Sequence, residues 1–164
     1  MNSKKRYIDF SEAKGLVGNI ARHIQKNNTR ITAVIGIVRG GLPPATMLSH
    51  YFGVPLYVID YSLRDRNNAQ TFNYHAVETI TNAHGTIGQD GHVLVIDDIN
   101  DSGDTFKAIW NFIDEELFAP KGFIYAALLE KCTSKFDCDF YGEILMDDQC
   151  NDWIVFPWEE WWQK

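Results

Sequence analysis

The segment Val93–Thr105 constrains the fold of this chain more strongly than any other stretch. It begins with four apolar residues, Val93–Ile96, which lead directly into the adjacent acids Asp97 and Asp98. A short loop with acidic, hydroxyl and glycine residues follows, and an amphipathic stretch starts at Thr105. Because such an apolar run is typical of a strand buried on both faces, we expect a buried strand that ends in two carboxylates, followed by a loop at the start of a helix.

The same alternation of strand and helix patterns runs through the rest of the chain. Buried strands are predicted at 31–38, 54–60, 92–98, 122–129 and 140–146, and helices at 11–27, 45–52 and 105–117. Strands that are apolar throughout and alternate with helices indicate a parallel sheet with helices on both faces. We therefore predict one α/β domain over 1–164, with a central, mostly parallel sheet flanked by helices and a ligand site beyond the carboxyl ends of its strands.

Two regions break this pattern. Residues 61–91 are polar, and we expect a long exposed loop, with one hairpin at most, of the kind that serves as a functional lid. Residues 153–164 are rich in aromatic side chains, and we expect them to be irregular.

The composition limits the classes of function. Of 164 residues, 45% are apolar, which is enough for a packed core, and the net charge is -7 from 15 basic and 22 acidic side chains. The chain has no basic run, which argues against a nucleic-acid partner, and no apolar run near the ~20 residues of a membrane span. Three cysteines without metal-ligand spacing, and an N-terminus without an apolar signal segment, predict a soluble cytoplasmic protein.

Residues 101–105 have the features of a phosphate-binding loop. Where a loop enters a helix, unpaired backbone N–H groups and the helix dipole attract anions. Gly103 allows the backbone to approach a phosphate closely, and Ser102 and Thr105 add hydroxyl donors. A simple helix cap would explain these residues equally well, so the loop alone does not decide between a structural and a binding role.

Helix capping does not explain Asp97 and Asp98. Two adjacent carboxylates at a strand end repel each other and need hydrogen-bond donors or cations nearby. A vicinal diol supplies donors, and a magnesium ion supplies positive charge. The acid pair and the loop together therefore favour a ligand that carries both hydroxyls and a phosphate, such as a ribose phosphate.

The whole stretch 93–105 resembles the phosphoribosyl pyrophosphate (PRPP) signature of type I phosphoribosyltransferases, in which an apolar strand, an acid pair and a short loop ending in threonine follow in register. The resemblance implies that Asp97 and Asp98 hold the ribose hydroxyls. It also implies a catalytic role for Asp101, which would handle a proton on a purine base. The residues implied to wrap the 5′-phosphate are Asp101, Ser102, Gly103, Asp104 and Thr105. Asp104 stands where the family often has glycine, and we expect its side chain to point to solvent in the first helical turn.

Three other segments resemble the purine-specific members of the family. Arg39 and Gly40 follow the first core strand, and although in isolation they indicate an ordinary turn, the resemblance implies contacts with the pyrophosphate of PRPP. Lys131 directly follows another strand and would read the 6-oxo group of a purine. Trp153 would stack on the base, and the carbonyl of Ile154 would accept a hydrogen bond from the base edge.

The remaining implied contacts involve a metal ion and a mobile hood over the site. The implied Mg²⁺ ligands are Asp97, Asp98 and Glu159. Glu159 departs from the aspartate of the family pattern, and Val155 replaces a polar residue, which leaves the preferred base open. Arg64 and Arg66 lie where the hood of the family begins, and the resemblance implies that one of them reaches the pyrophosphate. Residues 147–164 would form the base-binding segment.

The resemblance as a whole implies a Mg²⁺-dependent 6-oxopurine phosphoribosyltransferase of purine salvage. Such an enzyme transfers the 5-phosphoribosyl group from PRPP to xanthine, guanine or hypoxanthine and releases pyrophosphate, and family members form homodimers or homotetramers. Two alternatives stay open: a phosphoribosyltransferase for a different base, such as a pyrimidine, and a non-catalytic regulator that senses PRPP. The regulator would need a nucleic-acid-binding surface, and the acidic composition gives no sign of one.

Overall fold

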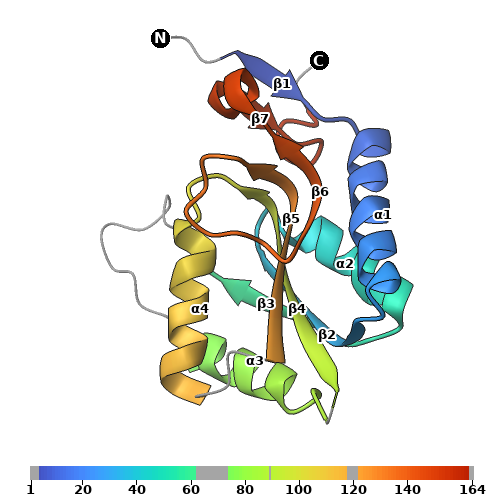
Figure 1. The fold of residues 1–164 in the computed structure, drawn as a ribbon, viewed down its shortest axis with the longest axis vertical. Coiled ribbons are helices and arrows are strands. Elements are labelled where there is room, and N and C mark those ends of the chain that lie inside the picture. Colours follow the sequence, from blue (N-terminus) through green and yellow to red (C-terminus); the bar gives the residue numbers. More distant parts are fainter. Residues whose placement is uncertain (1–3, 62–73, 89, 118–121, 163–164) are drawn as a thin grey trace.

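The computed structural model of the chain describes residues 4–61, 74–88, 90–117 and 122–162 (Figure 1). Within these residues, a five-stranded sheet lies between two layers of helices. Its strands are β2 (Arg30–Val38), β3 (Leu56–Asp60), β4 (Gly91–Asn100), β5 (Phe123–Lys131) and β6 (Phe140–Leu145). All neighbouring strands pair in parallel, in the order β3-β2-β4-β5-β6. The predicted α/β fold with a parallel sheet is therefore confirmed.

The strand order reverses between β2 and β4, and the two strands separate at that point. Their pairing ends at Gly36 and Ile96, whereas β4 continues to pair with β5 as far as Asn100 and Glu130. The last residues of β4 therefore have one edge that β2 does not cover. Ligands of open α/β sheets bind in the crevice at such a reversal point.

Helices cover both faces of the sheet. They are α1 (Phe10–Lys26), α2 (Leu42–Phe52), α3 (Tyr74–His84) and α4 (Asp104–Leu117). The start of α1 is capped by Asp9, whose carboxylate accepts a hydrogen bond from the Glu12 backbone N–H at 2.7 Å. At the end of α2, Gly53 adopts a left-handed conformation (φ 66°) that favours glycine. Among the helices that the structure describes, none has both the length and the apolar composition required to pass through a lipid bilayer.

The apolar run of β4 divides between two buried layers, which explains why every position in it is apolar. Leu94 and Ile96 belong to the core under α1 and α2. Val93 and Val95 point to the opposite face and belong to the core under α3 and α4. All four side chains are fully buried, as the strand period of two requires when both faces of a sheet are covered.

The prediction of a long loop over 61–91 is wrong, because α3 occupies Tyr74–His84. Ile80 and Ala83 lie three residues apart on one face of this helix, and both are buried in the core beneath it. The spacing of Val77, Ile80 and Ala83 is helical, but polar residues separate these three positions. Residues 62–73, which include Arg64 and Arg66 of the expected hood, lie outside the described residues.

A second, two-stranded sheet joins the two ends of the chain and was not predicted. Strand β1 (Lys5–Tyr7) pairs in parallel with β7 (Trp153–Val155). The expectation that residues from 153 onward are irregular is therefore wrong for β7. Three-residue strands are too short to display a period, and their pairing partners are too distant in the sequence for any local pattern to reveal. Figure 1 shows this small sheet at the end of the molecule where both termini lie.

The packing of α3 can be tested by truncating Ile80, which is 1% exposed. Ile80→Ala should lower the free energy of unfolding by about 2–5 kcal/mol, because it removes buried methyl groups and leaves a cavity. Thr81→Ala, at the exposed neighbouring position, should change it by less than about 0.5 kcal/mol. Urea denaturation followed by circular dichroism measures both values. An Ile80→Ala variant as stable as Thr81→Ala would contradict the packing of α3.

Candidate active site

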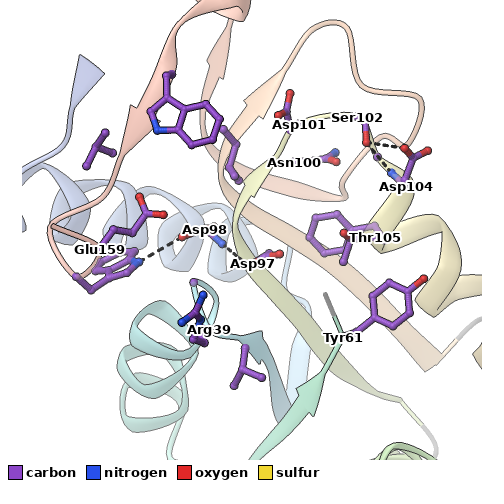
Figure 2. A pocket seen from close by; sticks show the side chains of 18 of the residues that line it. Arg39, Tyr61, Asp97, Asp98, Asn100, Asp101, Ser102, Asp104, Thr105 and Glu159 are labelled. Atoms are coloured by element: carbon purple, nitrogen blue, oxygen red, sulfur yellow. Dashed lines mark hydrogen bonds between the residues drawn. The ribbon is translucent and has the colours of Figure 1, made fainter. Parts of the chain in front are cut away.

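A cavity of about 1070 Å³ opens where β2 and β4 separate. Its walls come from four segments: the ends of β2 and β3, the end of β4 with the following loop, and the C-terminal segment after residue 152 (Figure 2). The sequence-predicted site residues among its lining are Arg39, Gly40, Asp97, Asp98, Asp101, Ser102, Gly103, Asp104, Thr105, Trp153 and Glu159. Segments far apart in the sequence therefore meet at the position that the parallel sheet predicts.

The loop at 101–105 leads directly into α4, as expected. Gly103 has a left-handed conformation (φ 85°), and a Cβ atom there would lie 2.6 Å from the backbone nitrogen of Phe136, so only glycine fits between the loop and its support. Ser102 Oγ donates to Asp104 Oδ2 at 2.8 Å. Asp104 is the first residue of α4 and is exposed, which confirms its predicted orientation.

Asn100 anchors this loop from behind, and the sequence analysis missed it. Its side chain is 1% exposed. Its Nδ2 donates to the carbonyl of Phe136 at 2.6 Å, and its Oδ1 accepts from Ser134 Oγ at 3.1 Å. The Lys135 N–H donates to the Ser102 carbonyl at 3.1 Å. The connection between β5 and β6 therefore holds the loop in place, and no local sequence pattern links residues this far apart.

Asp98 is a buried carboxylate, only 8% exposed, at the centre of the site. Its Oδ2 accepts a hydrogen bond from Trp158 Nε1 at 3.2 Å, and its backbone N–H donates to Asp97 Oδ1 at 2.9 Å. Burial raises the pKa of Asp98 to about 6; the charge of Glu159 adds to the rise, whereas the Trp158 hydrogen bond opposes it. A carboxylate in this environment is stabilised when a ligand brings hydrogen-bond donors or a cation to it.

The loop after β2 lies directly against Asp98. A Cβ atom on Gly40 would lie 2.1 Å from Asp98 Oδ2, and one on Gly41 would lie 2.4 Å from the Ile96 carbonyl. The peptide bond between Val38 and Arg39 is cis. Two glycines therefore allow the backbone that carries Arg39 to approach the acid pair closely, and this explains the Gly-Gly sequence after β2.

Lys131, at the end of β5, and Asp101, directly after β4, form an ion pair at one side of the site. Their Nζ and Oδ1 atoms are 2.8 Å apart, and 10% of the Lys131 side chain is exposed. Lys131 does not line the cavity itself. Its ammonium group is paired with Asp101, which does line the cavity. The structure therefore brings together two residues to which the resemblance assigned a proton-transfer role and a 6-oxo contact.

The backbone pairing of β7 determines which edge of that strand is available. The N–H of Trp153 donates to Lys4 at 2.8 Å, and the carbonyl of Val155 accepts from Ile8 at 2.9 Å. Because alternate residues of a strand direct their backbone groups to opposite edges, the N–H and carbonyl of Ile154 point away from β1. The Ile154 side chain is buried in the core, whereas Trp153 is 49% exposed on the cavity wall.

The charges around the cavity are unbalanced. Of the described lining residues, seven are acidic (Asp60, Asp97, Asp98, Asp101, Asp104, Glu159 and Glu160) and one, Arg39, is basic. No cluster of three metal-ligating side chains occurs among the residues that were described. One or two carboxylates together with ligand phosphate oxygens are the usual way in which Mg²⁺ is bound, so this set fits an ion that arrives with an anionic ligand.

Glu159 has a structural role that was not predicted. Its Oε2 accepts from the Phe156 backbone N–H at 2.8 Å and closes the turn that presents Trp158. Trp158 stacks on Phe156 with ring centroids 5.1 Å apart.

Asp60, Tyr61 and Trp158 also line the cavity without having been predicted as site residues. Burial raises the pKa of Tyr61, and the charge of Asp104 adds to this effect.

Comparisons with known proteins agree with the fold and identify the family of the chain. Residues 7–164 match the family model of the phosphoribosyl transferase domain. The chain is 28% identical over 131 residues to a xanthine-guanine phosphoribosyltransferase of Cereibacter sphaeroides, a match that covers 77% of this chain and 68% of that protein.

Two solved structures resemble the chain over nearly its whole length. A purine phosphoribosyltransferase from Pyrococcus horikoshii superposes with a TM-score of 0.71 at 27% identity, covering 95% of both chains. A xanthine-guanine-hypoxanthine phosphoribosyltransferase from Helicobacter pylori gives a TM-score of 0.72 at 20% identity, covering 99% of this chain and 97% of that one. The second likeness, at low identity, supports the fold alone.

The close approach of Gly40 to Asp98 predicts opposite effects for two glycine substitutions. Gly40→Ala should lower the free energy of unfolding by about 1–3 kcal/mol, because the new methyl group meets a buried carboxylate that Trp158 holds in place. Gly15→Ala, in an exposed turn of α1 with open space around the new Cβ, should raise it by about 0.4–1 kcal/mol. Chemical denaturation measures both, and effects of the same sign would contradict the packing described.

Proposed function

Because this chain belongs to the phosphoribosyl transferase domain family, we propose that it is a 6-oxopurine phosphoribosyltransferase. It would transfer the 5-phosphoribosyl group from PRPP to xanthine, guanine or hypoxanthine and release pyrophosphate, as a step of purine salvage. The observation that carries this proposal is the ion pair of Asp101 and Lys131 at 2.8 Å. The pair joins the end of β5 to the first residue of the loop at 101–105, beside a cavity that Trp153 also lines.

The donor site would use the residues at the reversal point of the sheet. The loop at 101–105 would bind the 5′-phosphate through backbone N–H groups at the start of α4. Asp97 and Asp98 would accept hydrogen bonds from the ribose hydroxyls. Arg39, with the backbone of its loop beside Gly40, would contact the pyrophosphate and stabilise the charge that develops on it as it leaves.

Magnesium is the expected cofactor, because the cavity is acidic and PRPP is strongly anionic. Seven acids and one base among the described lining residues would repel a bare pyrophosphate. The residues that would hold the ion are Asp97 and Asp98, with Glu159 as a further ligand. When bound, Mg²⁺ would neutralise charge on the leaving pyrophosphate. Since Glu159 Oε2 already accepts from Phe156, we propose that its other oxygen faces the ion.

The acceptor site would bind a purine between β5 and the C-terminal segment. An ammonium group has three N–H donors, so Lys131 can hold Asp101 and donate to a 6-oxo oxygen at the same time. Trp153 would stack on the base, since flat aromatic surfaces pack together. The carbonyl of Ile154, directed away from β1, would accept a hydrogen bond from the base edge.

The reaction would be a substitution at C1′ of the ribose. The bond from C1′ to the pyrophosphate oxygen breaks, and a bond from C1′ to a purine nitrogen forms. The proton that the base loses would pass to Asp101. This residue begins the loop at 101–105, and its carboxylate is paired with Lys131. A positioned carboxylate is a usual acceptor for a proton in such a transfer.

The choice of base tests the proposal directly. Reduced protein, Mg²⁺ and PRPP are mixed with xanthine, guanine, hypoxanthine, uracil or orotate in turn, and pyrophosphate release is followed. We expect release with at least one 6-oxopurine and none above background with the pyrimidines. Release with a pyrimidine alone would favour a different acceptor, and binding of PRPP without release with any base would favour a sensing role.

We also propose that the chain assembles as a homodimer or homotetramer. Trp161 and Trp162, near the C-terminus, are 73% and 63% exposed. Large apolar side chains gathered on a surface commonly mark an interface. Sedimentation velocity distinguishes a monomer from either assembly.

Asp101→Asn should lower kcat by at least ~100-fold, because the amide cannot accept the proton of the base. Binding of PRPP should be largely unchanged, since the loop contacts its phosphate through backbone groups. Steady-state kinetics and calorimetry measure the two effects separately. Glu115→Gln, an exposed charge change on α4, serves as the control and should leave kcat unaltered. Full activity in Asp101→Asn would refute the role of Asp101.

Removal of magnesium should weaken donor binding. In titration calorimetry, we expect PRPP to bind at least about tenfold more weakly with EDTA than with Mg²⁺, a difference of about 1.4 kcal/mol. The reason is the excess of carboxylates in the cavity. Circular dichroism under both conditions checks that the protein stays folded. Equal affinities in EDTA and in Mg²⁺ would contradict a metal-assisted site.

A further inference from the structure

Two thiols from separate segments meet beside the base site. Cys132 directly follows β5, and Cys150 lies in the 3-10 helix η2 (Asp147–Asn151). Their Sγ atoms are 3.1 Å apart. Both residues are also held at one backbone group: the Cys132 N–H donates to the Leu145 carbonyl at 2.9 Å, and the Cys150 thiol donates to the same oxygen at 3.1 Å. The end of β6 therefore fixes the two thiols next to each other.

The two cysteines differ in access to solvent. Cys132 is exposed, whereas Cys150 is 8% exposed. A small oxidant can reach the sulfur of Cys132, and the buried sulfur of Cys150 lies within about 1 Å of bonding distance of it, since a disulfide bond is about 2.05 Å long. This is the arrangement of an attacking thiol paired with a resolving thiol.

We propose that Cys132 and Cys150 form a site of reversible disulfide formation that takes small-molecule disulfides such as oxidised glutathione as its oxidant. The thiolate of Cys132 attacks one sulfur of the small disulfide, forms a mixed disulfide and expels one thiol. The thiolate of Cys150 then attacks Cys132 Sγ, forms the internal disulfide and expels the second thiol. The two protein thiols are thereby oxidised, one small disulfide is reduced to two thiols, and excess dithiol reverses the reaction.

The crosslink would join the two segments that frame the proposed base site. Cys132 is next to Lys131, and Cys150 precedes Trp153 by three residues. Forming the bond shortens the Sγ–Sγ separation from 3.1 Å to about 2.05 Å, which draws the two segments toward each other. Binding sites need their groups held within about 0.5 Å, so the crosslink should weaken use of the base. This functional consequence rests on the proposed function, but formation of the disulfide does not.

The third cysteine provides a matched control within the same chain. Cys138 is buried, and burial raises the pKa of its thiol, with the nearby charge of Glu130 adding to the rise. Unlike Cys150, which lies against the exposed Cys132, Cys138 has Asn100 Nδ2 beside its Sγ at 3.5 Å. Cys138 should therefore remain reduced under conditions that oxidise the Cys132–Cys150 pair.

The covalent step is tested on the full chain by mass spectrometry. The reduced protein is incubated with oxidised glutathione, alkylated, and digested. We expect the intact protein to lose two hydrogen masses, and a peptide pair linked through Cys132 and Cys150 to appear, with Cys138 alkylated only after unfolding. Cys150→Ser should stop at a mixed disulfide on Cys132, and Cys138→Ser should crosslink as the wild type does. A stable mixed disulfide in the wild type, or no oxidation, would overturn the proposal.

The functional step compares oxidised and reduced protein in the pyrophosphate-release assay. We expect oxidation to lower kcat/KM for the base by at least about threefold, with full recovery in dithiothreitol and no effect of the oxidant on Cys132→Ser, which lacks the attacking thiol. An unchanged kcat/KM in the crosslinked protein would overturn the link to the base site. If the reduced protein shows no transfer with any base, the proposed function fails instead, while the mass measurement still decides whether the disulfide forms.

Discussion

The buried carboxylate of Asp98 is the group on which the geometry of the site depends. Two segments from distant parts of the chain contact it: the Gly40 backbone lies against it, and Trp158 donates a hydrogen bond to it. A carboxylate with so little exposure is costly unless it is hydrogen-bonded or paired with a cation. Its cost is met in part by Trp158, and a ligand with hydroxyls or a metal ion would meet the rest. The same acid therefore organises the fold around the site and limits which ligands the site can bind.

At the end of β4, two adjacent residues have different roles: Asn100 supports the structure, and Asp101 has the proposed chemical role. Asn100 points back into the protein and fastens the phosphate loop to the carbonyl of Phe136. Asp101, one residue later, points to the other side and pairs with Lys131. Because the β5–β6 connection supplies Phe136 while β5 itself supplies Lys131, one stretch of chain supports the proposed donor loop and carries the proposed base contact. The two halves of the site are thus held by the same element, and a displacement of that element would affect both.

The local patterns of the sequence predicted the sheet and the acid pair with its loop, because both depend on short-range features, whereas Arg39, Lys131 and Trp153 were expected only from the family resemblance. The apolar run of β4 indicates that this strand is buried on both faces. The acid pair and the loop that follows it lie in one continuous stretch of the sequence. The features that were missed depend on pairing between distant residues. Strands β1 and β7 contain three residues each and exist only because they pair with each other. The role of Asn100 depends on partners in another loop, and α3 has only a narrow apolar face within polar surroundings.

The small sheet explains how the segment after residue 152 comes to be part of the site. Pairing with β1 uses the backbone groups of Trp153 and Val155, so the opposite edge of β7 faces away from β1. A side chain also connects β1 to the five-stranded sheet, since Arg6 Nη1 lies 3.0 Å from Glu143 Oε1 on β6. Because this ion pair is partly exposed, its contribution to stability is small, and the backbone hydrogen bonds define the position of β7. The turn that follows β7 then delivers Trp158 to Asp98. An element at the N-terminus therefore sets the distance between the proposed base contact and the acid pair.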